Sequence, residues 1–141
     1  MNKKHMVLAA LMIFATVNLS QAQTFYPVLK KFSTAEKERV DKVYAAALSS
    51  GHNGLIESAL AVVTKVKLDL PADKFPMIKN EIENLVADGG TPVIRSKALL
   101  ASIVFANPAI FKKEAAHQYG DSNALFNALA DRTTETILSS N

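Results

Sequence analysis

The 141-residue chain contains no cysteine and no tryptophan, and it has only five glycines, five prolines and three histidines. Without cysteine it forms no disulfide, no thiolate zinc site and no lipid anchor on cysteine, and it offers no catalytic thiol. Hydrophobic residues make up 49% of the chain. Packing of apolar side chains alone must therefore hold the fold.

A hydrophobic run long enough to cross a bilayer is also missing, because that takes about 18 residues or more. The longest apolar stretch, Met6 to Val17, covers about twelve residues and follows the basic start MNKKH. Ser20 and Ala22 then fit the small-residue positions of a cleavage site. This pattern predicts a signal peptide over residues 1–22. We expect an exported protein, periplasmic or extracellular, with no membrane span in its mature form.

Neither sign of charge is in excess beyond the leader. Residues 1–22 hold two of the 16 basic residues and none of the 13 acidic ones, so the remaining 119 residues carry a net charge of +1. The basic clusters that remain, Lys30-Lys31 and Lys112-Lys113, are only dipeptides. A nucleic-acid partner is not expected, because such proteins concentrate basic residues in a stripe. The length suits one domain.

The chain does contain an internal repeat of 37 residues. Shifted by that distance, the sequence pairs identical residues: Ala35 with Ala72, Lys37 with Lys74, Lys42 with Lys79, Leu48 with Leu85, Ala61 with Ala98, and Pro71 with Pro108. A period of this size is typical of stacked units. After an N-terminal arm at 23–33, we expect one helical-repeat domain at 34–138, with units at about 34–70, 71–107 and 108–138.

Each unit is predicted to hold two helices, because apolar residues recur at spacings of three and four. The stripe of the first helix is Val40, Val43, Tyr44, Ala47 and Leu48, and that of the last is Leu125, Phe126, Leu129, Thr133 and Ile137. No strand-like alternation occurs. We expect an all-α fold of about six helices in antiparallel pairs, either a short right-handed solenoid or a compact bundle.

Helix ends are marked by capping residues. Ser33 and Glu36 form a capping-box pattern that starts the first helix near Thr34. Gly51 near a helix C-terminus and Asn53 as an N-cap predict the next boundary. Further starts are expected at Thr91-Pro92, and at Asn107-Pro108 for a helix of about three turns before Gly120.

The second unit resembles a HEAT or armadillo-like repeat. Asp88, the run Pro92-Val93-Ile94-Arg95 and Ala98 match the turn and second helix of that family, and Pro76 falls in its first helix, where these repeats often carry a proline. In the first unit, Gly51 or Ser50 and Glu57 stand in place of the Asp and the Arg. The resemblance implies an Asp–Arg ladder between neighbouring repeats and a role as an interaction scaffold.

The turn DGGTP at 88–92 has two interpretations, an anion-binding loop or a structural corner. A phosphate cradle exposes several backbone N–H groups at a helix N-terminus, whereas Pro92 has none and Asp88 is acidic. The residues favour a corner. Arg95 is then expected to pair with Asp88 or with a neighbouring helix end.

Catalytic and metal motifs are scarce. Glu114 and His117 are spaced i and i+3 like two helical metal ligands, but the chain after the leader has no third histidine besides His52 and His117. No nucleophile elbow or zinc-protease motif occurs. We expect no enzyme and no cofactor. A small-ligand or metal-binding exported protein built around His117 and Glu114 is the alternative.

The main hypothesis is an exported, non-enzymatic interaction module that binds an envelope protein or an extended ligand. A third option is that the domain only self-associates. The expected binding residues are exposed polar positions on the second helices: Arg95, Lys97, Lys65 and Lys67. The apolar arm TFYPVLKKF at 24–32 has two readings. It either folds back over the open end of the first unit or docks on a partner.

Overall fold

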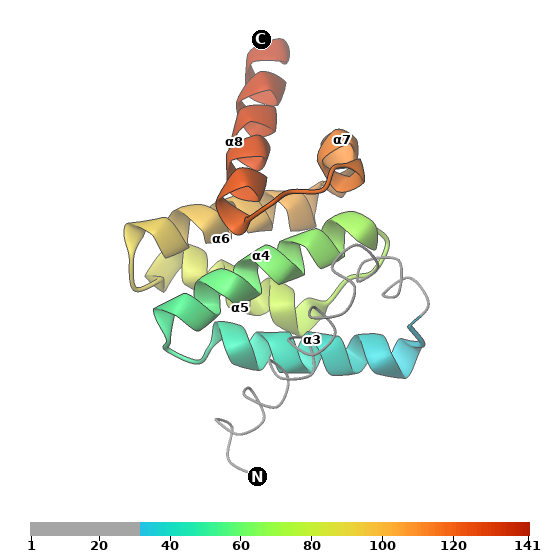
Figure 1. Ribbon diagram of the computed structural model, residues 1–141, viewed down its shortest axis with the longest axis vertical. Coiled ribbons are helices and arrows are strands. Elements are labelled where there is room, and N and C mark those ends of the chain that lie inside the picture. Colours follow the sequence, from blue (N-terminus) through green and yellow to red (C-terminus); the bar gives the residue numbers. More distant parts are fainter. Residues whose placement is uncertain (1–31) are drawn as a thin grey trace.

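The computed structural model describes residues 32–141, which form six α-helices, one 3₁₀ helix and no strand. The elements are α3 (Thr34–Leu48), α4 (Asn53–Asp69), α5 (Pro76–Asp88), α6 (Pro92–Ala106), η1 (Pro108–Phe111), α7 (Lys112–Ala116) and α8 (Ser122–Ser139), shown in Figure 1. The prediction of an all-α fold is confirmed. The predicted signal peptide at 1–22 and all of the arm before Phe32 lie outside the described residues.

The predicted start of α3 is confirmed by a complete capping box. The Glu36 backbone N–H donates to Ser33 Oγ over 3.3 Å, and the Ser33 backbone N–H donates to Glu36 Oε2 over 2.7 Å. The hydrogen bond from the Ser33 backbone N–H, together with the Ser33 side chain, lowers the pKa of the Glu36 carboxyl, because both favour its charged form. The next boundary was predicted one residue late, since His52 is the N-cap of α4 and Asn53 its first residue.

The start of α5 is stabilised from another helix. Its N-cap residue, Phe75, has a left-handed backbone (φ 46°) and provides no side-chain cap. Asp41, buried on α3, accepts hydrogen bonds from the backbone N–H groups of Met77 (3.1 Å) and Ile78 (2.8 Å). Asp41 thus does the work of the missing cap, and its carboxylate lies where the positive end of the α5 dipole favours it.

Two layers of helices make up the body (Figure 1). Helix α3 lies beside α5, α4 lies beside α6, and each pair of helices within a unit is in contact. The contact between Asp41 and Ile78 spans 37 residues, which is the sequence period. The first two predicted units therefore pack as neighbours.

The third unit departs from this arrangement. Asn107 makes no side-chain cap, and the predicted helix of about three turns is instead η1 followed by the five-residue α7, which ends at Ala116. The main contacts of η1, α7 and α8 are with α4 and α6. The C-terminal segment therefore lies across the second helices of both earlier units and forms a third layer above them (Figure 1).

One apolar core joins all three layers. Its most deeply buried large side chains come from every unit: Leu48, Leu60, Val63, Ile78, Ile82, Ile94, Phe111 and Leu129. Phe32, the first described residue, packs against this core from the end of the arm. Within residues 32–141, no single helix has the length and apolar character of a membrane span, although α6 and η1–α7 meet those criteria together as a pair bent by 105°.

Candidate interaction site

Three of the four predicted binding residues are buried, which corrects the expectation that they are exposed. Lys65 and Lys67 are each 5% exposed and Lys97 is 8% exposed, whereas Arg95 is exposed. The physical reason differs between them. Lys65 and Lys97 are covered by the third layer, which lies across much of the face that α4 and α6 share, whereas Lys67 is buried against the turn after α4 and Phe105 on α6. Binding through these side chains remains a prediction that the structure does not test.

Lys65 joins α4 to the end of α7. Its Nζ donates to the carbonyl oxygen of Ala115 over 2.8 Å and lies 3.5 Å from Asp69 Oδ1. The cation therefore sits at the C-terminus of α7, where unpaired carbonyl groups favour positive charge. This lysine holds the third layer in place.

Lys67 stabilises the turn that follows α4. Its Nζ donates to the carbonyl oxygens of Pro71, over 2.9 Å, and Asp73, and it lies 5.6 Å from the centre of the Phe105 ring on α6. Burial lowers the pKa of Lys67, and the nearby carboxylate of Asp73 acts in the opposite direction. The Lys67 ammonium group is therefore engaged by the turn after α4 and by α6.

Lys97 lies where α4, α6 and α8 meet. Its Nζ is 3.0 Å from Glu57 Oε2 on α4 and 5.5 Å from the centre of the Phe126 ring on α8. Glu57 is the residue that replaces the expected arginine in the first unit. A charge pair thus crosses between units, but between different positions from the Asp–Arg ladder that the resemblance implies.

Arg95 and the turn at 88–92 form a structural corner. Arg95 Nη1 donates to the carbonyl oxygen of Gly89 over 2.7 Å, so it pairs with the end of α5, as one of the two predicted alternatives states. Gly89 is required by space, because a Cβ there would lie 2.6 Å from the Leu85 carbonyl oxygen. Thr91 accepts from the Ile94 backbone N–H and caps α6, and Pro92 follows as predicted.

The structure separates Glu114 from His117. His117 lies beyond the end of α7 with an extended backbone (ψ 144°). Its ring is tilted by 60° to that of Tyr119, and the ring centres are 4.6 Å apart. Glu114 is buried and its Oε1 accepts from Arg132 Nε on α8 over 3.1 Å. Among residues 32–141, no group of three or more metal-ligating side chains comes together.

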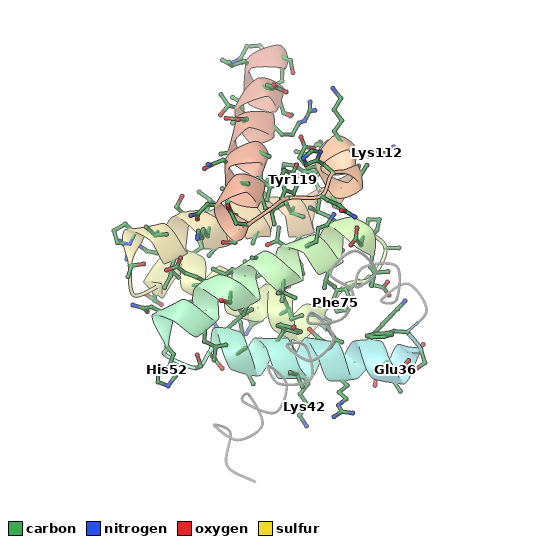
Figure 2. All side chains as sticks on the ribbon, in the orientation of Figure 1. Glu36, Lys42, His52, Phe75, Lys112 and Tyr119 are labelled. Carbon is green, nitrogen blue, oxygen red and sulfur yellow. The ribbon has the colours of Figure 1, made fainter. Side chains whose placement is uncertain are left out.

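A small polar cluster remains between α7 and α8. The second carboxylate oxygen of Glu114, Oε2, is buried without a hydrogen bond. Burial and the charge of Glu114 raise the pKa of Tyr119, which lies beside α7 (Figure 2). Arg132 also reaches Glu135 over 3.1 Å. This cluster links α7 to α8. Sequence analysis missed it because Glu114 and Arg132 lie 18 residues apart, and no local pattern shows that their two helices pack together.

The most exposed apolar side chains are on α8. Leu125, Phe126 and Leu129 in its first half are buried, whereas no residue after them on this helix is. Ile137 and Leu138 near its end are 59% and 70% exposed. Ile137 belongs to the apolar stripe predicted for this helix, but the sequence gave no sign that the end of the stripe extends beyond the packed body. Figure 1 shows this half of α8 projecting beyond the other helices.

In comparisons with known protein families, curated proteins and solved structures, no significant match to this chain is found.

Proposed function

We propose that this chain is an exported, non-enzymatic protein whose role is to bind another protein chain. The single observation that carries the proposal is the projecting half of α8, residues 130–139, which presents Ile137 and Leu138 to solvent. Exposed apolar side chains grouped on one element favour an interaction site more than scattered ones do. The signal-peptide pattern at 1–22 supports export to the periplasm or the extracellular space.

The architecture supports a scaffold role. The repeat of 37 residues, the pairing of α3 with α5 and of α4 with α6, and the Asp88 and Arg95 positions are features of HEAT-like modules, which commonly present helix surfaces to partners. The face originally expected to bind lies under η1, α7 and α8. Among the predicted binding residues, Arg95 keeps its place at an exposed corner and is the one retained in this proposal.

The small-ligand or metal alternative is not favoured by any observation around α7. His117 lies beyond the end of α7, and Glu114 is engaged by Arg132. Metal analysis of the purified protein, with His117→Ala as its control, remains the direct test of that alternative.

The proposal is tested by crosslinking in the source cell, followed by immunoprecipitation from the envelope and the medium. We expect a discrete crosslinked protein species that is lost in the double variant Ile137→Glu/Leu138→Glu. Val93→Glu is the matched control, because Val93 is 52% exposed and belongs to α6, outside the projecting half of α8. A folded protein that yields no crosslinked species under any crosslinking condition contradicts the proposal.

A further inference from the structure

The projecting half of α8 has a sequence that holds a helix poorly by itself. The run TTETILSS at 133–140 is rich in threonine and serine, which are weaker helix formers than alanine or leucine. Thr133, Thr134 and Thr136 return their hydroxyl groups to the carbonyls of the preceding turn. Helices of two or three turns are marginal in water without tertiary packing. We therefore expect that this segment is stabilised as a helix by packing against another surface.

The charges around this segment are arranged in opposite signs on two neighbouring helices. Asp131 and Glu135 are exposed on α8, and Lys113 and Lys112, the latter labelled in Figure 2, are exposed on α7. The link between Glu114 and Arg132 places these two pairs in the same region of the molecule. Glu135 is bonded to Arg132, whereas Asp131 and the two lysines take part in no ion pair within residues 32–141.

A surface with apolar residues and both signs of charge is complementary to a rotated copy of itself. In a two-fold symmetric dimer, every contact occurs twice, so an acidic group on α8 that meets a lysine on the partner's α7 is matched by the reverse pair. The only other exposed large apolar side chains between residues 32 and 141 are Met77, Val93 and Leu99, on α5 and α6. Helices α3 and α4 present none, so a head-to-tail contact through them would leave Ile137 and Leu138 without an apolar counterpart.

We propose that the occupant of this surface is a second copy of the chain, with α8 of each copy packed against α7 and α8 of the other. This inference rests on the proposed function and names its partner. The dimer buries Ile137 and Leu138 of both copies and pairs Asp131 with Lys112 or Lys113 of the opposite copy.

The first test is the solution mass of the protein, expressed as the full chain and purified with the N-terminus that the cell leaves on it. Light scattering or sedimentation is expected to give twice the chain mass at micromolar concentration. The double variant Ile137→Glu/Leu138→Glu is expected to give a folded monomer whose circular dichroism loses at most the helical signal of the end of α8, and Val93→Glu to remain a dimer. A monomeric native protein, or a dimer that survives the double variant, overturns the inference.

A charge exchange tests the arrangement within the dimer. Asp131→Lys alone and the double variant Lys112→Glu/Lys113→Glu are each expected to weaken dimerisation about tenfold or more. The triple variant that combines all three changes is expected to recover at least part of the affinity. If the combination is as weak as the worse of its parents, the proposed α7–α8 pairing is wrong.

The outcome also separates this inference from the proposed function. A monomer that still forms a discrete crosslink to a different protein through α8 overturns the second copy as occupant and leaves the interaction role standing. A dimer with no other crosslinked protein supports the inference and limits the role to self-association. A monomer with no crosslinked protein contradicts both.

Discussion

Asp41 links two helices through hydrogen bonds from backbone N–H groups to its side-chain carboxylate. It is buried on α3 and accepts from two N–H groups at the start of α5, one of them on the fully buried Ile78. We expect Asp41→Ala to lower the free energy of unfolding by about 2 kcal/mol, because it leaves those donors without a partner. Urea denaturation measures this change.

The neighbouring Lys42, exposed on the same helix (Figure 2), provides the control. Lys42→Ala is expected to change stability by no more than about 0.5 kcal/mol, as is usual for surface substitutions. Equal effects at the two positions would show that Asp41 does not cap α5.

Tyr119 reports the charge of Glu114. Burial and the Glu114 carboxylate raise the pKa of the Tyr119 hydroxyl above its usual value near 10. The folded protein therefore holds this proton at pH values where the unfolded chain has lost it, and stability falls as the pH rises above about 10. We expect Glu114→Gln to lower the pKa of Tyr119 in an ultraviolet titration.

Glu83→Gln, an exposed carboxylate on α5, should leave that titration unchanged. A Tyr119 curve that is insensitive to Glu114→Gln would mean that the carboxylate does not act on the phenol.

At the residue scale, local signals were predictable and long-range ones were not. Ser33, Glu36 and Thr91 cap helices as expected, because capping depends on neighbours three residues away. Lys97 was predicted to be exposed because a lysine on a helix usually is. Its burial depends on Glu57 and Phe126, which are distant in sequence and reach it only after the third layer has formed.

Helices α3 and α4 are joined by a turn whose two glycines have opposite roles. Gly51 has a positive φ of 77°, which other residues adopt at a cost, whereas Gly54 has no positive φ, lies in the first turn of α4 and has no atom within 4 Å of an added Cβ. We expect Gly51→Ala to destabilise the protein by about 1 kcal/mol and Gly54→Ala to stabilise it by about 0.5 kcal/mol. Thermal unfolding of both variants distinguishes the two, and equal signs would contradict this account of the turn.

Lys97 holds α8 against the first two units. Lys97→Glu places a second carboxylate beside Glu57 in a site where the lysine side chain is 10% exposed, and we expect a loss of about 2 kcal/mol in unfolding free energy. Lys97→Met keeps the apolar stem and should cost about 1 kcal/mol or less. Denaturant unfolding compares the two variants. Similar small losses in both would show that the charge pair does not secure α8.

That expectation changes how binding is tested at this position. Charge reversal at Lys97 or Lys65 would change stability together with any binding, because both side chains are buried. Variants of Arg95, Ile137 and Leu138 address exposed groups instead.

At the scale of elements, the helices of the first two units followed from the period of apolar residues, and their pairing followed from the 37-residue repeat. The third unit did not. The segment at 108–119 is too short for its periodicity to tell a three-turn helix from a 3₁₀ turn and a five-residue helix. Its position over α4 and α6 depends on Phe111, Phe126 and Leu129 entering the common core, and no local pattern indicates that.

The whole molecule is a body of stacked helices that closes its own second-helix face and leaves one helix end projecting. The candidate site is therefore the end of α8 and not the predicted lysines of α4 and α6. Sequence analysis identified Ile137 as part of an apolar stripe, but whether a stripe is covered depends on how far the rest of the body extends. The central claim is that this end binds a protein chain.

The most direct test of that claim is a photo-crosslinking amino acid placed at Leu138 and, as the control, at Lys42 on α3, with crosslinking in the source cell. The account predicts one discrete protein adduct from position 138 and none from position 42, and its mass identifies the partner as a second copy or as another protein. A folded protein that gives no adduct from position 138, or the same adducts from both positions, would contradict the claim.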